Sequence, residues 1–209
     1  MHHRNPFHRH RNSQKRFYEE RNVYFITSNT YEKFPYFQEE IFCELWIEEL
    51  KLCKLKFCFD LYAFCLNYEH FHWMIQPNEK WNISKVMKFF KENVSRDINK
   101  IIKYQPPEGA MAPSRLHGDN NMRESDTASC RLQMDTKISI FQTAFLQKNG
   151  HHHSFPNFQW QKSFHDHVIR GDEDFENHVE YTIYNFVKHG LPENWKYTSL
   201  NYSDEMNFE

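Results

Sequence analysis

Two histidines stand at alternate positions in the segment CLNYEHFHWMIQP, residues 65–77. Successive side chains of a β-strand point to opposite faces of the sheet, so His70 and His72 share one face and the aromatic residues beside them share the other. Two imidazoles placed in this way can both bind a single metal ion. Because the same spacing also occurs in ordinary buried or surface histidines, a metal site requires a third ligand from another part of the chain.

A candidate for that ligand lies in the segment FENHVEYTIYNFVKHGL, residues 175–191. Its apolar residues recur at helical spacing and form a stripe that would pack on the fold: Phe175, Val179, Ile183 and Phe186. Tyr181, Asn185 and Lys188 fall together on the opposite side of this predicted helix. These three side chains would face an active site, a partner or only solvent, and their spacing alone does not decide among these.

The strands and helices that must position these residues follow from the hydrophobic pattern. Residues 21–30 are rich in β-branched and aromatic side chains and predict a first strand. Apolar residues at helical spacing predict one helix within residues 37–51 and another over residues 82–102. Between these helices, residues 55–77 are long enough for two strands, with a turn near residues 67–69. The aromatic face of the second of these strands would belong to a core packed by helices.

The second half of the chain has a less regular pattern. Residues 104–135 are rich in proline, glycine and polar side chains, and they predict a flexible insertion. Order is expected to resume with a strand or hairpin at residues 137–150 and a strand region at residues 158–170. A final helix over residues 172–189 begins with three acidic residues, which suit a helix N-terminus, and stops at Gly190.

The composition indicates one domain with a real core. The chain has 209 residues, of which 17% are aromatic, so disorder is excluded as a description of the whole. Its 5 cysteines include no C-x-x-C pair, which favours reduced packing residues over a disulfide framework or a zinc cage. The sequence lacks the run of about 20 apolar residues that a membrane-spanning helix needs, and it begins without a signal-peptide pattern. A cytoplasmic protein with no membrane partner is therefore expected.

The net charge of −2 does not indicate a nucleic-acid partner, but the charges are unevenly distributed. Residues 1–16 form a basic arm without acidic residues, and residues 201–209 form an acidic tail. The arm either is a solvated, disordered segment or follows a phosphate backbone. The candidate DNA contacts are Arg4, Arg9, Arg11, Lys15 and Arg16 in the arm, with Lys85 and Lys88 on the polar face of the second predicted helix.

Three blocks of the sequence together resemble the HUH single-tyrosine (IS200-like) transposases, and in particular their REP-associated tyrosine transposase branch. The segment HFH, residues 70–72, is similar to the HUH motif. The segment WQKSFHDHVIR, residues 160–170, is similar to a characteristic block of the branch, and YTIYNFVKHGL, residues 181–191, resembles its tyrosine helix. The three blocks also follow the family's order along the chain. The resemblance covers residues 17–200 apart from the insertion.

This resemblance implies a fold and a set of site residues. The implied fold is α+β, with a central antiparallel sheet and helices mainly on one face, similar to ferredoxin-like and RRM-like domains. His70, His72 and Asn185 would bind Mg²⁺ or Mn²⁺. Tyr181 would be the nucleophile. Residues 17–200 would form this catalytic domain.

The chemistry of these residue types agrees with that implication. A tyrosine phenol has a pKa near 10, so only about one molecule in a thousand is phenolate at pH 7, and attack on a phosphodiester needs assistance. A metal ion held by two neutral imidazoles and an amide would polarise the scissile phosphate and stabilise charge in the transition state. Lys188 would assist the tyrosine or contact a phosphate. Attack would leave a 5′-phosphotyrosine link and a free 3′-OH, which allows strand transfer rather than simple hydrolysis.

The implied substrate is single-stranded DNA, often beside a REP-like hairpin, and a homodimer is left open. Exposed aromatic residues such as Tyr68 or Tyr184 would stack on unpaired bases or belong to the core. Two other functions also fit parts of the sequence. A non-catalytic single-stranded nucleic-acid-binding module derived from such a transposase would not need Tyr181 beside a metal triad. A metal-dependent hydrolase would need the histidines and a water, but not the tyrosine. Detection of a covalent protein–DNA adduct would distinguish the transposase from the binding module and the hydrolase.

Overall fold

The strands and helices of the structure form one α+β domain. The computed structural model describes residues 22–103 and 124–207. Its strands are β1 (Tyr24–Asn29), β2 (Asp60–Leu66), β3 (His70–Gln76) and β4 (His165–Val168). Its helices are α1 (Glu40–Phe57), α2 (Ile83–Ile101), α3 (Glu124–Asn149), α4 (Asp172–Ile183) and α5 (Asn185–Lys188). The strand and helix order predicted for the first half of the chain is therefore confirmed.

The described strands form one antiparallel sheet in the order β2-β3-β1-β4. Strand β1 lies between β3 and β4, so that Thr27 pairs with His72 on one side and Phe25 pairs with His167 on the other. Helix α1 connects β1 to β2, and α2 follows β3. This order is that of a ferredoxin-like sheet. The predicted α+β fold with a central antiparallel sheet is confirmed.

Helices α1 and α2 cover one face of the sheet because β3 buries its aromatic side chains there. Phe71 and Trp73 are both fully buried. The ring of Phe90 in α2 lies 4.4 Å from that of Trp73, and the ring of Trp46 in α1 lies 5.3 Å from that of Phe71, measured between centroids. Burial of each such side chain contributes roughly 1.5–3 kcal/mol to folding. This core fixes which face of β3 is left for the histidines.

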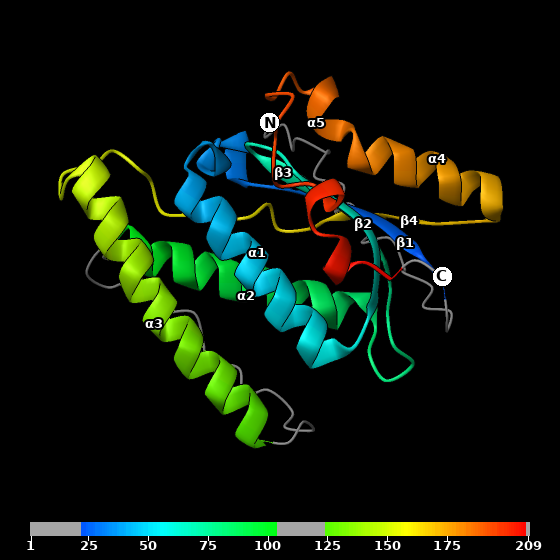
Figure 1. The fold of residues 1–209 in the computed structure, drawn as a ribbon, viewed down its shortest axis with the longest axis horizontal. Coiled ribbons are helices and arrows are strands. Elements are labelled where there is room, and N and C mark those ends of the chain that lie inside the picture. Colours follow the sequence, from blue (N-terminus) through cyan, green and yellow to red (C-terminus); the bar gives the residue numbers. More distant parts are fainter. Residues whose placement is uncertain (1–21, 104–123, 208–209) are drawn as a thin grey trace, which may run out of the picture.

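Helices α4 and α5 lie on the opposite face of the sheet, as Figure 1 shows. Phe175 of α4 meets Tyr62 of β2 edge-on, with 5.2 Å between the ring centroids. Farther along α4, Tyr181 meets Phe25 of β1 at 5.9 Å. The sheet therefore separates a helical core layer from a thinner layer that covers the histidine face.

Helix α3 shows that the prediction for the middle of the chain was wrong. Residues 137–150 were expected to form a strand or hairpin, but residues up to Asn149 belong to α3. Its buried residues Met134, Ile138 and Phe145 recur at helical spacing, whereas Ile140 is exposed. The segment KISIF alternates like a strand, yet only one of its two isoleucines enters the core, because α3 packs one face against α1 and α2.

A buried charged cluster holds α3 on the other two core helices. Arg131 of α3 donates from Nη1 to Glu49 Oε1 of α1 over 3.1 Å and from Nη2 to Asp97 Oδ2 of α2 over 2.5 Å. Both carboxyl groups are fully buried. Burial, followed by the hydrogen bond with Asp97, raises the pKa of Glu49 to about 8. Burial alone would also raise the pKa of Asp97, but hydrogen bonds from Arg96 and Glu49 lower it below its ordinary value.

The expected segment boundaries fall partly outside the described residues. The basic arm, residues 1–16, lies outside them, as do residues 104–123 of the expected insertion, whereas residues 124–135 lie in α3. The described part of the expected acidic tail is attached to β2. There the backbone N–H of Asn207 donates to the carbonyl of Leu61 over 2.8 Å, and the side chain of Asn207 accepts from the N–H of Leu61 over 3.0 Å.

The described cysteines lie mostly in the core. Cys43, Cys53 and Cys65 are buried free thiols, as expected of packing residues, whereas Cys58 is exposed. Within residues 22–103 and 124–207, no helix is long and apolar enough to cross a membrane.

Candidate active site

Strand β3 presents His70 and His72 to the face of the sheet that α4 and α5 cover. Their ring centroids lie 5.0 Å apart, and the two residues are 5% and 4% exposed. They share one face, as their alternate spacing predicts, because Phe71 between them points into the helical core.

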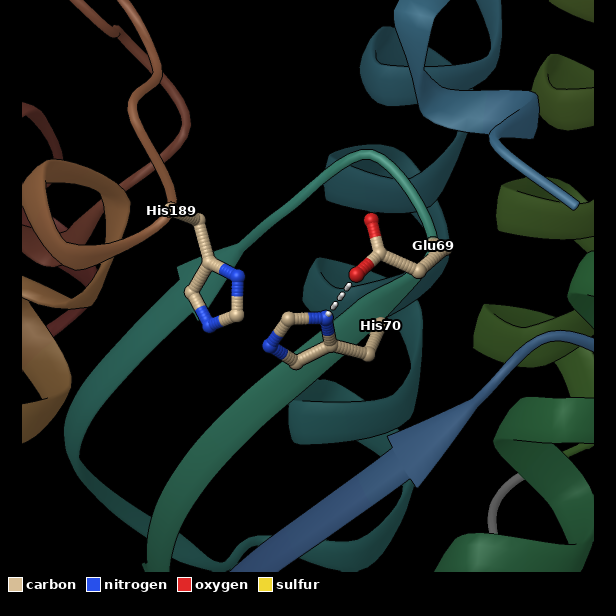
Figure 2. Close-up of side chains that lie close together, drawn as sticks. All are labelled: Glu69, His70 and His189. Atoms are coloured by element: carbon tan, nitrogen blue, oxygen red, sulfur yellow. Dashed lines mark hydrogen bonds and ion pairs between the residues drawn. The ribbon is translucent and has the colours of Figure 1, made fainter. Parts of the chain in front are cut away.

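The side chain of Asn67, in the turn between β2 and β3, links His70 to Asn185. Its Nδ2 donates to His70 Nε2 over 3.0 Å and to Asn185 Oδ1 over 2.8 Å. Because an amide nitrogen can only donate, His70 Nε2 accepts and the ring proton lies on Nδ1, which donates to Glu69 Oε1 over 3.1 Å (Figure 2). The lone pairs of His70 Nε2 and Asn185 Oδ1 therefore point toward one place, as the ligands of a metal ion must.

Burial keeps both imidazoles neutral. Burial, with the nearby His70 as the second cause, lowers the pKa of His72 to about 3. Burial also lowers the pKa of His70, although Glu69 acts in the opposite direction. His72 Nδ1 lies 2.8 Å from Thr27 Oγ1, and this hydrogen bond orients the ring so that Nε2 is its candidate ligand atom. Metal ions bind the neutral form of imidazole, so both rings are in the state that coordination requires.

The last helix is broken just before Asn185. The sequence predicts one helix over residues 172–189, but α4 ends at Ile183 and α5 begins at Asn185, with Tyr184 at φ −102° and ψ 10° between them. Thr198 Oγ1 donates to the carbonyl of Ile183 over 2.8 Å and satisfies an acceptor at the end of α4. Asn185 is the first residue of α5 after this break.

The helical projection grouped Asn185 with Tyr181 and Lys188 and left open whether the three side chains face a site, a partner or solvent. Asn185 is 1% exposed and lies beside both imidazoles, whereas Tyr181 and Lys188 remain on the outer surface. The structure brings the amide into the buried group and leaves the phenol and the ammonium at its edge.

Tyr181 lies beside this buried group on the last turn of α4. Its ring meets His72 edge-on with 5.5 Å between the centroids, and the residue is 39% exposed. Lys188 Nζ lies 3.5 Å from Tyr181 Oη and 4.9 Å from the centre of its ring. The phenol is therefore open to solvent and adjacent to a cation.

An open hollow of about 610 Å³ lies on the same surface. It is lined by Asn177, Glu180, Tyr181, Tyr184, Asn185, Val187 and Lys188. Because the hollow is open to solvent and lined by Tyr181, a chain-like substrate could lie across it and bring a backbone group to the phenol.

Two further ligand-type residues were missed by the sequence analysis. Figure 2 shows Glu69 and His189 on either side of His70. The ring of His189 lies 4.5 Å from that of His70, and the candidate ligand atoms of the three residues lie within 4.8 Å of one another. Glu69 is next to the histidine pair, and His189 belongs to the block YTIYNFVKHGL, so both stood within segments already singled out. Nothing in their spacing indicated that they would meet.

The other predicted site residues are not brought to this surface. Lys85 and Lys88 are exposed on α2, which packs on the opposite face of the sheet from Tyr181. The five basic residues of the arm lie outside the described residues. A DNA contact at any of these positions stays a prediction.

Comparison with known proteins agrees with the blocks found in the sequence. Residues 7–108 match the family model described as "Transposase IS200 like". Over 45 residues the chain is 47% identical to a protein of Haemophilus influenzae described as a REP-associated tyrosine transposase. The chain resembles the IS200-like transposases. The resemblance to the REP-associated branch is confirmed as well, although that match covers only 20% of this chain and 26% of the relative.

A solved transposase structure has the same fold. The structure described as the REP-associated tyrosine transposase bound to a REP hairpin aligns with a TM-score of 0.54 and 17% sequence identity, covering 93% of this chain and 90% of that one. The fold similarity therefore extends over nearly the whole chain. The family match, by contrast, includes His70 and His72 and ends before Tyr181.

Proposed function

We propose that this protein is a metal-dependent single-stranded DNA transposase that cleaves and rejoins DNA through a covalent 5′-phosphotyrosine intermediate. The observation that carries the proposal is the position of Tyr181. Its phenol is exposed, lies 3.5 Å from the Lys188 ammonium, and its ring contacts His72 at the edge of a buried His–His–Asn group. The resemblance to the IS200-like transposases supports the same activity.

The proposed ligands of Mg²⁺ or Mn²⁺ are His70 Nε2, His72 and Asn185 Oδ1. Two neutral imidazoles and an amide oxygen fit a divalent ion, and two of these atoms already converge on the amide of Asn67. When bound there, the ion supplies positive charge that polarises the scissile phosphate and stabilises its transition state. Glu69 orients His70 through its Nδ1 hydrogen bond.

Tyr181 supplies the nucleophile. Its phenolic oxygen gives up a proton and bonds to phosphorus, while the bond between phosphorus and the 3′ oxygen of the preceding nucleotide breaks. That oxygen takes up a proton and becomes a free 3′-OH. Lys188 stabilises the ionised phenol or the phosphate oxygens. Because the phosphotyrosine ester conserves the energy of the broken bond, attack by a 3′-OH rejoins the DNA.

The proposed substrate is single-stranded or hairpin DNA of the REP-like kind. The structural neighbour is described as bound to a REP hairpin. On this chain, the open hollow beside Tyr181 leaves room for an unpaired strand, and Tyr184, which is 49% exposed, offers a ring for base stacking. Basic residues of the arm would add affinity that weakens with salt.

The test is denaturing electrophoresis of the protein with labelled single-stranded and hairpin oligonucleotides and Mg²⁺ or Mn²⁺. The wild-type protein should form an adduct with DNA that survives denaturation. Tyr181→Phe removes only an exposed hydroxyl, so this variant should still bind DNA and form no adduct. The matched control is Tyr184→Phe, which alters the other exposed tyrosine of the hollow and should keep the adduct.

The remaining outcomes assign a different function. An adduct that persists in Tyr181→Phe and disappears in Tyr184→Phe moves the nucleophile to Tyr184. Cleavage without any adduct indicates a metal-dependent hydrolase. Binding of single-stranded DNA without cleavage indicates a non-catalytic binding module derived from a transposase.

A further inference from the structure

A second cluster of ligand-type side chains lies between β4 and α4. It consists of His167 on β4 with Asp174 and His178 in the first two turns of α4. His167 Nε2 lies 3.1 Å from Asp174 Oδ2, and His178 Nδ1 lies 2.9 Å from Asp174 Oδ1. The two imidazoles are stacked, with 4.9 Å between centroids and 18° between planes. The three ligand atoms all lie within 4.8 Å of one another.

The local structure explains why these residues meet. Asp174 and His178 are four residues apart and therefore lie on one face of α4. His167 pairs with Phe25 on the face of the sheet that α4 covers. The backbone N–H of Arg170 donates to Asp174 Oδ2 over 2.7 Å and orients the carboxylate toward both rings.

This donor set is that of a transition-metal site. Two imidazoles and one carboxylate are ligands typical of Zn²⁺, which takes water at its remaining position. Imidazole nitrogen favours Zn²⁺ over Mg²⁺. The side chains of Asp174 and His178 are each 26% exposed and that of His167 is 48% exposed, so an ion can enter from solvent. His167 directs a nitrogen at the carboxylate, and His178 Nδ1 lies between the carboxylate and the backbone carbonyl of Asp174, at 2.9 and 2.8 Å. An ion would replace these hydrogen bonds.

The geometry points to a Zn²⁺ site at His167, Asp174 and His178 that fixes α4 on β4. Strand β4 has 4 residues and, in the described sheet, pairs only with β1, whereas α4 packs mainly on β2 and β3. The ion joins this strand to the helix that carries Tyr181, one turn beyond His178. The site is separate from the His70–His72 pair.

Phe25 lies between the two sites and contacts a residue of each. Its ring lies 4.8 Å from His178 and 5.9 Å from Tyr181, and it is stacked on His72 at 5.2 Å. An ion that fixes His178 therefore restricts the Tyr181 ring, because both side chains contact Phe25. The ion itself need not contact DNA.

The test measures Zn²⁺ bound to the full chain by equilibrium dialysis, and hydrogen exchange of the α4 amides with and without Zn²⁺. Because the chain has 14 histidines, binding is compared as a difference between variants. His178→Asn and Asp174→Asn should each bind one Zn²⁺ fewer than the wild-type protein. Zn²⁺ should slow amide exchange over residues 172–183 in the wild-type protein and not in these variants.

Two controls separate this site from other histidines. His165→Asn removes another exposed histidine from β4 and should keep both the bound ion and the slowed exchange. In a His72→Ala background, which lacks a ligand of the other site, His178→Asn should again bind one Zn²⁺ fewer than its parent protein. Metal-free exchange of both cluster variants should match that of the metal-free wild-type protein, which shows that they fold. Equal Zn²⁺ binding by the wild-type protein and both cluster variants, or no Zn²⁺ effect on wild-type exchange, overturns the proposal.

Discussion

Asn67 and Asn185, which are 118 positions apart in the chain, are joined by a buried hydrogen bond of 2.8 Å from Asn67 Nδ2 to Asn185 Oδ1. The same nitrogen donates to His70 Nε2 over 3.0 Å. The amide of Asn67 thus occupies the place where two proposed ligand atoms converge. A metal ion that binds both atoms must displace it, so Asn67 competes with the ion for the site.

Asn67→Ala is expected to destabilise the metal-free protein by about 1–3 kcal/mol, because it leaves the buried oxygen of Asn185 without its donor. Mn²⁺ should raise the melting temperature of this variant more than that of the wild-type protein, since the ion no longer displaces an amide. Thermal unfolding with and without Mn²⁺ measures both effects.

The matched control for that experiment is Asn82→Ala. The side chain of Asn82 caps α2 by accepting from the N–H of Lys85 over 3.0 Å, so its loss should destabilise the protein by about 0.5–2 kcal/mol. Its response to Mn²⁺ should equal that of the wild-type protein. A Mn²⁺ response of Asn67→Ala no larger than that of the wild-type protein would show that the two do not compete.

His70→Ala and His72→Ala should each lose DNA cleavage while retaining the fold. Removal of a ligand weakens metal binding and the charge stabilisation that the ion supplies, which is worth several kcal/mol, so the cleavage rate should fall at least about a hundredfold. Cleavage by the wild-type protein should stop in EDTA and return with Mg²⁺ or Mn²⁺. Circular dichroism and DNA binding check the fold, and His152→Ala, in an exposed loop, serves as control. Undiminished cleavage in EDTA would rule out the metal role.

Lys188→Gln should slow cleavage by roughly 10–100-fold, because a hydrogen bond to a charged group is worth about 1.5–3 kcal/mol and Lys188 Nζ lies 3.5 Å from Tyr181 Oη. Single-turnover rates of adduct formation at saturating DNA measure the chemical step apart from binding. Lys162→Gln removes an exposed lysine outside the hollow and should leave the rate unchanged. A Lys188→Gln rate equal to that of the wild-type protein would show that Lys188 does not assist cleavage.

The raised pKa of Glu49 predicts that the protein becomes less stable as the pH rises. The unfolded chain loses the Glu49 proton near pH 4.3, whereas burial and the neighbouring Asp97 raise its pKa in the folded protein to about 8. The folded state therefore binds more protons between these values, so the free energy of unfolding decreases from about pH 5 to about pH 8.

Glu49→Gln should flatten that part of the pH dependence. The amide remains neutral, accepts from Arg131 and donates to Asp97, so the variant should be more stable than the wild-type protein at pH 8, by at most a few kcal/mol. Urea unfolding at several pH values measures the slope, with Glu176→Gln on the exposed face of α4 as control. A Glu49→Gln slope as steep as that of the wild-type protein would assign the pH dependence to other groups.

The sequence by itself determined the elements around the histidine pair. The alternation of β3 placed Phe71 and Trp73 in the core and His70 and His72 on the other face, and helical spacing located α1 and α2. These features are local, because side-chain direction on a strand or a helix depends on positions only a few residues apart. The three sequence blocks also indicated the transposase resemblance that the comparisons confirmed.

The tertiary structure decided which side chains surround the histidines. The burial of Asn185 beside the imidazoles depends on how α4 and α5 pack on the sheet. The meeting of His189 with His70, and of His167 with Asp174, requires α4 and α5 to lie across the sheet. The KISIF segment is helical because it packs against α1 and α2 as part of α3. Such contacts join residues from separate elements, and their free energy comes from packing that no local pattern records.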